Sequence, residues 1–228
     1  MEKIVNGGEL GLIILRRHPS AKHYSLRIKD GQVIGTMPLQ GSEREMLAFI
    51  DKKRERLICM LQNSPKHPVW NESTDIQTHT FRLHIFRTAR ANFYMNLKDG
   101  VLYIACPEET DFENERVQQQ LRTLFEKALR HEAMRTLPLR LKTLAAQHSF
   151  NYTSVTIRNA KTRWGSCSSQ KHISLSLSLM LLPGHLIDYI LLHELCHTVE
   201  MNHGKRFQCL MDKVTNGRAQ ALRRELKS

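Results

Sequence analysis

Residues 193–203 of this chain read HELCHTVEMNH, and no other segment restricts the possible fold as strongly. His193 and His197 are four residues apart, so on a helix both imidazoles lie on one face, about one turn apart. Two histidines held in this way can bind one zinc ion, and Glu194 can then act as general base toward a metal-activated water. The preceding residues 186–192 are apolar on nearly all sides, which predicts a helix buried through a domain.

A catalytic zinc site needs a third protein ligand and one open position. His203 is six residues past the second histidine and stands between Asn202 and Gly204. Both neighbours tolerate the left-handed backbone conformation that ends helices. We therefore predict that the helix ends near Met201 and that His203 turns back toward the metal.

Two other interpretations of the motif stay open. Glu200 shares the helical face of His193, but on a straight helix it would lie roughly 10 Å farther along the axis. We therefore expect Glu200 beside the site or at the surface rather than on the metal. The second alternative is a buried helix whose histidines are satisfied by hydrogen bonds, without any metal. Cys196 points about 100° away from His197 and is expected to be a small buried residue.

Two segments of the sequence resemble the YgjP-like metallopeptidase family. Residues 193–207 read HELCHTVEMNHGKRF, and residues 163–168 read RWGSCS. The YgjP-like proteins are zincins, related to the SprT-like and minigluzincin proteases. The resemblance is strong over residues 155–207 and weak in the N-terminal part, where it rests on the YSLRI segment at residues 24–28.

This resemblance implies a cofactor, a set of ligands and a substrate strand. It implies one Zn2+ ion held by His193, His197 and His203, with Glu194 as the catalytic residue. In zincins, a strand beside the motif helix usually binds the extended substrate through backbone hydrogen bonds. By resemblance, residues 172–180 are the candidate for that strand.

Two departures from the family pattern concern the substrate surface rather than the metal motif. Family members commonly carry an aromatic residue where this chain has Gln208. They also tend to carry a tryptophan in the first helix, where this chain has Arg54, Arg56 and Leu57.

Three further residues are candidates for contacts with the substrate or with the oxyanion formed during hydrolysis. Tyr189 is one turn before His193 on the same helical face. Arg163 and Trp164 precede the motif helix and could line its cleft. The alternative for these two is structural, with the tryptophan packed under a turn and the arginine tying a strand to a helix.

The remaining sequence predicts an α+β fold. Apolar residues alternate between residues 9 and 37 and again between residues 81 and 104, which predicts strands. Asp30-Gly31 and Asp99-Gly100 are typical hairpin turns within these groups. We expect a β-rich N-terminal subdomain with one helix at residues 1–107. A zincin-like, mainly helical catalytic domain with a small sheet and the HExxH active-site helix should follow at residues 108–228.

Two capping boxes predict where helices begin. Ser42 and Glu45 form the first box and start the helix of the N-terminal subdomain. Thr110 and Glu113 form the second box and start a long helix, which Pro138 should kink or end two residues earlier.

Charge and composition limit the location and the partners. The net charge of +12, from 34 basic and 22 acidic residues, makes nucleic acid a candidate for nonspecific binding. Solvated positive faces explain the same charge without a specific site. No apolar run approaches the ~20 residues of a membrane span, and the N-terminus lacks a basic-then-apolar signal pattern. Five cysteines without framework spacing suit a reducing compartment, so we expect a cytoplasmic protein without membrane contact.

The leading hypothesis is a zinc metallopeptidase that hydrolyses peptide bonds in peptide or protein substrates. One alternative is a zinc-stabilised binding module without turnover. A purely structural zinc site has four protein ligands and no open position, so it would have no use for a base such as Glu194. A second alternative is a nucleic-acid-associated protease that acts on DNA-bound proteins, as SprT-like relatives are understood to do.

Overall fold

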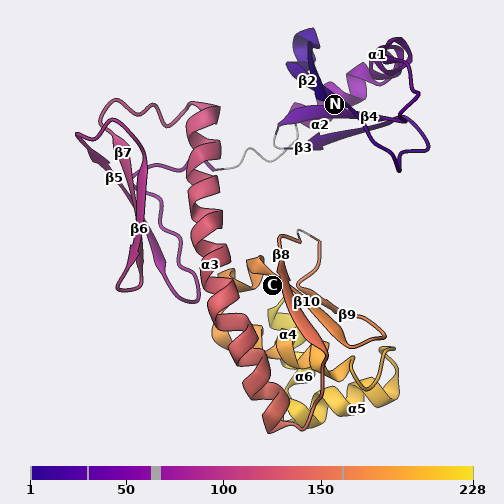
Figure 1. The fold of residues 1–228 in the computed structure, drawn as a ribbon, viewed down its shortest axis with the longest axis vertical. Helices are drawn as coiled ribbons and strands as arrows, with labels where there is room; N and C mark the ends of the chain where they lie inside the picture. The colour runs from indigo at the N-terminus through magenta and orange to yellow at the C-terminus, as the bar shows by residue number, and fades with distance from the viewer. Residues whose placement is uncertain (1, 30, 63–67, 161, 228) are drawn as a thin grey trace. The chain divides into compact units, whose positions relative to one another are not determined.

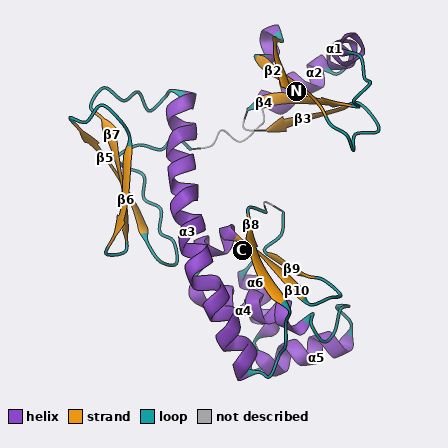
Figure 2. Ribbon diagram, viewed as in Figure 1, coloured by secondary structure: helices purple, strands orange, loops and turns teal. Residues whose placement is uncertain are grey.

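The computed structural model describes residues 2–29, 31–62, 68–160 and 162–227. Contacts divide the chain into two compact units, Met1–Pro68 and Val69–Ser228. The described residues form an α+β fold with six α-helices and three small sheets, which confirms the predicted fold class (Figure 2). In this part of the chain, no helix combines the length and the apolar character needed to cross a bilayer.

The first unit is a four-stranded sheet with two helices. The strand order is β1-β2-β4-β3, with β2 and β4 parallel and the other pairs antiparallel. The pairing of β3 with β4 confirms the hairpin expected at Asp30-Gly31, although Asp30 itself lies outside the described residues. The elements are β1 (Glu2–Asn6), a 3-10 turn (Gly8–Leu10), β2 (Leu12–Arg17), β3 (Ser25–Lys29), β4 (Gln32–Met37), α1 (Glu43–Lys52) and α2 (Arg54–Gln62).

The helical part of this unit differs from its prediction in two ways. Two helices, α1 and α2, replace the single helix that was expected, and they meet at Lys53. The Ser42 side chain makes no capping hydrogen bond, so the predicted capping box is wrong. Its backbone N–H instead donates to the Tyr24 hydroxyl, which in turn donates to the Glu45 carboxylate. Ser42 and Glu45 therefore join α1 to Tyr24, which lies just before β3.

The second unit begins with a three-stranded sheet of order β5-β7-β6. Its strands are β5 (Arg82–Thr88), β6 (Tyr94–Lys98) and β7 (Val101–Pro107). Asp99 and Gly100 have φ values of 50° and 73°, which confirms the predicted hairpin turn between β6 and β7. Buried residues of β5, including Leu83 and Ile85, share one core with the helices that follow. For this reason the compact unit starts at Val69, whereas the sequence placed a boundary at residue 107.

The long helix α3 (Glu115–Gln147) connects the two sheets of this unit (Figure 1). Its N-terminal half packs on the first sheet, where Phe125 lies edge-on to Phe81 with ring centroids 5.6 Å apart. Its C-terminal half is tied to α4 by Arg140, whose guanidinium donates two hydrogen bonds to Asp188 at 2.7 and 2.6 Å. The helix therefore fixes the motif helix α4 relative to the first sheet.

The capping box predicted at the start of α3 is absent, and of the two predicted effects of Pro138, a kink or an end of the helix, the end is absent. The helix is capped by the Asn114 side chain, which accepts from the Arg116 backbone N–H, and Thr110 bonds to the Pro107 carbonyl instead of forming a capping box. Pro138 lies inside the continuous helix rather than ending it. The ring removes one hydrogen bond to the carbonyl four residues earlier. That turn is exposed, since Met134 is 62% accessible, so water can satisfy the carbonyl.

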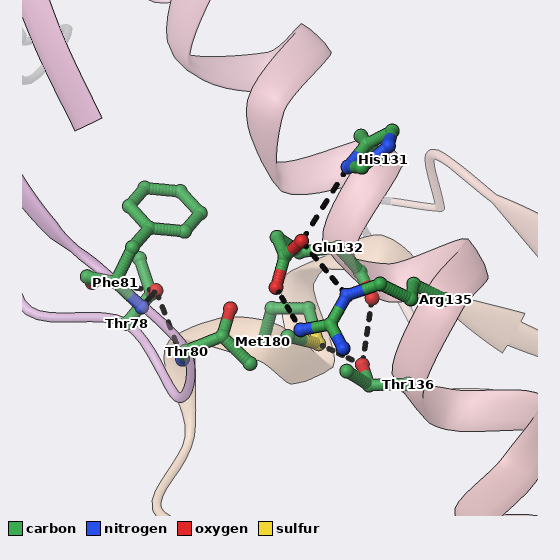
Figure 3. Close-up of polar contacts among 8 residues, drawn as sticks. All are labelled: Thr78, Thr80, Phe81, His131, Glu132, Arg135, Thr136 and Met180. Atoms are coloured by element: carbon green, nitrogen blue, oxygen red, sulfur yellow. Dashed lines mark hydrogen bonds and ion pairs between the residues drawn. The ribbon is translucent and has the colours of Figure 1, made fainter. Parts of the chain in front are cut away.

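A buried carboxylate lies in the middle of α3 (Figure 3). Glu132 is 5% exposed and accepts two hydrogen bonds from Arg135, at 2.7 and 3.1 Å. These bonds, above all, lower the pKa of Glu132. One turn further along, the Thr136 hydroxyl contacts the sulfur of Met180, whose carbonyl accepts from the His79 backbone N–H. The polar contacts of this region thus lead from α3 to the segment just before α4.

The second sheet and three helices complete this unit. Their bounds are β8 (Ser154–Arg158), β9 (Gly165–Cys167), β10 (His172–Ser176), a 3-10 helix (Leu177–Leu181), α4 (Gly184–Cys196), α5 (Lys205–Val214) and α6 (Ala219–Glu225). The strand order is β8-β10-β9, so β10 is the central strand. The strand predicted over residues 172–180 is shorter than expected, because the chain turns into the 3-10 helix after Ser176.

Candidate metal centre

The motif helix α4 ends at its two histidines. The helix spans Gly184–Cys196, with His197 as its C-cap residue, so it stops earlier than the predicted end near Met201. The predicted left-handed residues are also absent, since Gly204 has a φ of −73° and Asn202 has no positive φ. An irregular segment from residue 200 to 204 leads into α5 and returns His203 to the end of α4.

The three histidines converge as the sequence predicts. The Nε2 atoms of His193, His197 and His203 form a triangle in which every pair is 3.2 Å apart. Nitrogen ligands about 2.0–2.1 Å from a tetrahedral zinc ion stand about 3.3–3.4 Å apart, so the triangle fits such an ion closely. Among the described residues, the cluster has three members and no fourth His, Cys, Asp or Glu. Three ligands leave one tetrahedral position open, as in catalytic rather than structural zinc sites.

One hydrogen bond fixes the orientation of His197. Its Nδ1 lies 3.1 Å from the backbone carbonyl oxygen of Glu200, so Nδ1 carries the proton and donates it. The Nε2 lone pair is then directed into the triangle, which is how a second partner usually prepares a metal-ligating histidine. Glu200 therefore serves the site through its backbone, while its carboxylate lies outside the histidine cluster.

Phe207 forms the apolar floor of the cluster. Its ring stacks on His197 with centroids 4.5 Å apart and meets the rings of His193 and His203 edge-on at 4.9 Å each. Phe207 is 4% exposed and belongs to the main core through α5. Phe207 lies within the motif segment, but the sequence alone does not indicate this role. Its contact with all three imidazoles depends on how α5 packs against α4.

Two of the three histidines are shifted toward the neutral form. Burial, followed by the positive charges of the other two histidines and of Arg223, lowers the pKa of His193 to about 4. Burial also lowers the pKa of His197, and the hydrogen bond to Glu200 opposes this shift. Neutral imidazoles are the form that ligates metal ions, so these shifts of the His193 and His197 pKa values favour metal binding.

Glu194 is buried beside the cluster. It is 5% exposed, and its Oε2 atom has no hydrogen-bond partner. Burial raises the pKa of this carboxyl group to about 7, and the positive charge of Arg163 acts in the opposite direction. An unsatisfied buried carboxylate is costly unless something polar pairs with it. Glu194 directly follows His193 in α4, and its carboxyl group packs against Gly165 on β9.

Gly165 on β9 makes room for this carboxylate. A Cβ atom at position 165 would lie 2.6 Å from Oε1 of Glu194, 2.8 Å from its Cγ and 2.9 Å from its Cδ. Such contacts are too short for any side chain, so only glycine allows Glu194 its present position. Gly165 lies within the RWGSCS segment, but the sequence of that segment does not indicate this role. No local signal reveals it, because the contact joins β9 to α4.

The three candidates for substrate or oxyanion contacts, Tyr189, Trp164 and Arg163, differ in burial and in their neighbours. Tyr189 is 7% exposed, and its ring centroid lies 6.4 Å from that of His193. Trp164 is half-buried, packs against the main core and accepts a hydrogen bond from the Ser176 backbone, which agrees with its structural alternative. Arg163 is exposed and lines a hollow on the second sheet, close enough to Glu194 to influence its pKa.

The strand expected to bind the substrate has no free edge. β10 pairs with β8 on one side and with β9 on the other, so it cannot accept a further strand. That prediction is wrong because β10 is the central strand of the sheet, while β9 is an edge strand that contacts α4. In β9, the backbone N–H and C=O groups of alternate residues point to opposite sides of the strand. The groups that face β10 belong to Trp164, Ser166 and Ser168. The backbone groups of Gly165 and Cys167 therefore point to the free edge of β9.

Comparison with known proteins gives one family match and one similar solved structure. The chain matches the family model described as YgjP-like, metallopeptidase domain, over residues 22–228. Among solved structures it is similar to the crystal structure of the metallopeptidase zymogen of Pyrococcus abyssi abylysin. That similarity has 23% identity and a TM-score of 0.37, and it covers 40% of this chain and 91% of that chain. A comparison with curated proteins gives no match. The range matched by the family model includes the three histidines, Glu194 and Gly165.

Proposed function

The chain belongs to the YgjP-like metallopeptidase family, and from this premise we propose that it is a zinc-dependent peptidase with its active site at the end of α4. The observation that carries the proposal is the triangle of three Nε2 atoms, 3.2 Å apart, beside a buried carboxylate with an unpaired oxygen. His193, His197 and His203 would hold one Zn2+ ion. A zinc ion bound there supplies Lewis acidity that activates a water and polarises the scissile carbonyl.

Glu194 is the general base and then the general acid in this proposal. Its carboxylate takes the proton of the attacking water and returns it to the nitrogen of the leaving amine. The backbone of Gly165 holds the carboxylate in place from the side of β9, while Phe207 keeps the imidazoles in position from below. Tyr189 and Arg163 remain the candidates for stabilising the oxyanion, because each lies near one of the reacting groups.

The extended substrate pairs with the free edge of β9 rather than with β10. Gly165 and Cys167 direct their backbone N–H and C=O groups to that edge, so they can form the hydrogen bonds of an added strand. Since a Cβ at position 165 would touch Glu194, a strand in this place brings a peptide bond beside the carboxylate.

The decisive experiment is the substitution Glu194→Gln. The glutamine is nearly isosteric, so zinc content should stay at one ion per chain while cleavage of a fluorogenic peptide falls by at least about a thousandfold, as expected when the base is lost. Glu200→Gln is the matched control, since its carboxylate lies outside the cluster, and it should keep both zinc and activity. Cleavage that persists in Glu194→Gln would contradict the mechanism. A wild-type protein that binds zinc but cleaves nothing would favour a binding module.

A further inference from the structure

The outer face of the second sheet carries a wide polar hollow. Its volume is about 890 Å3, and it extends over all three strands and the loop that joins β8 to β9. Hydroxyl groups make up much of its surface, because the residues that alternate with the buried Ile173 and Leu175 are serines. The hollow therefore offers several hydroxyl groups that can form hydrogen bonds with a bound chain.

The charges that line this hollow are all positive. Arg158 stands on β8 and Arg163 just before β9, and both are exposed. Among the residues that the structure describes, neither guanidinium has a carboxylate partner or a hydrogen bond. No aspartate or glutamate lines the hollow. Two arginines without counter-ions beside a set of hydroxyls form a surface that favours carboxylates.

Positive charge also surrounds the metal centre itself. Arg163 acts on Glu194, and Arg223 on α6 acts on His193 and Tyr189. The nearby acidic residue Asp188 is already paired with Arg140. Two cations thus act on this site, Arg163 from just before β9 and Arg223 from α6.

We propose that the hollow selects peptide substrates with acidic side chains, which bind Arg158 and Arg163 while the backbone pairs with β9. This inference rests on the proposed peptidase function and names its substrate class. A strand added at the edge of β9 points alternate side chains to opposite faces of the sheet. One set faces α4 and the metal centre, and the other set reaches the outer face, where the hollow lies. Acidic residues at alternate substrate positions can therefore reach the arginines.

The test compares three fluorogenic peptides with one scissile sequence and flanks rich in aspartate, glutamine or lysine. For the zinc-loaded full chain, kcat/KM should be about tenfold higher for the aspartate peptide than for the glutamine peptide, the size of one charge-assisted hydrogen bond. Arg158→Gln should bring this ratio close to one, and Arg158→Glu should favour the lysine peptide. Arg116→Gln is the matched control, because Arg116 is an exposed arginine at the start of α3, outside the hollow, and it should keep the ratio.

Binding of the same peptides to the Glu194→Gln variant, measured by fluorescence anisotropy, separates the two proposals. If the wild type cleaves all three peptides equally well, the acidic selectivity is refuted while the peptidase function stands. If nothing is cleaved but the aspartate peptide binds and Arg158→Glu abolishes that binding, the function fails and the acidic site stands. Binding of a single-stranded oligonucleotide through Arg158, without preference for the aspartate peptide, would overturn the proposal in favour of nucleic acid.

Discussion

The substitution Gly165→Ala tests whether the backbone of β9 positions the catalytic carboxylate. The new Cβ would meet Oε1, Cγ and Cδ of Glu194 at 2.6, 2.8 and 2.9 Å, while ordinary contacts begin near 3.4 Å. The carboxylate must therefore move by roughly 0.5–1 Å, since the opposing atoms on β9 are backbone. A displacement of about 1 Å at a reacting group can lower the rate about a hundredfold. Overpacking should also cost about 1–3 kcal/mol of unfolding free energy.

The assay needs three readouts on the same preparation. We expect kcat for a fluorogenic peptide to fall about a hundredfold, zinc content to stay at one ion per chain, and the melting temperature to drop by a few degrees. Gly204→Ala is the matched control, because a Cβ there meets nothing within 4 Å although the residue follows His203 directly. A Gly165→Ala protein with kcat within about twofold of wild type would refute the role given to Gly165.

Three other predictions follow from the structure. His203→Ala should lower zinc affinity by orders of magnitude, whereas Glu200→Ala should leave it nearly intact because Glu200 contributes only its backbone carbonyl. Zinc affinity is measured for both variants by titration against a chelator. The reverse result would move the third ligand from His203 to Glu200. Glu132→Gln should cost about 1.5–3 kcal/mol at neutral pH by weakening the bonds from Arg135. Since the folded pKa of Glu132 is lowered, its contribution is present above the unfolded pKa of about 4.3 and is lost as the pH falls through the folded value. The stability difference in urea unfolding should therefore shrink at acidic pH, and a constant difference would contradict this reasoning. If Lys205 and Arg206 bind DNA, affinity should fall steeply with salt, with a log–log slope of about 0.9 per phosphate contact, and no binding at ~50 mM salt would exclude that role.

The sequence alone predicted much of the histidine cluster. Histidines spaced by four residues share a helical face wherever the helix lies, so His193 and His197 could be paired without knowledge of the fold. The same local logic holds for the Asp99-Gly100 hairpin, where the backbone geometry of a tight turn depends on the two residues within it. His203 was also predicted, but from the tolerance of Asn202 and Gly204 for the left-handed conformation, which neither residue adopts.

Only the tertiary structure decided how the site is completed. Three features each join segments that are distant in sequence: the contact of the edge strand β9 with α4, the fit of Gly165 against Glu194 and the packing of Phe207 on the imidazoles. The early end of α4 at its C-cap His197 also depends on context, because the Glu200 carbonyl is turned to His197. Periodicity reports which face of an element is buried, but it carries no information about which partner covers that face.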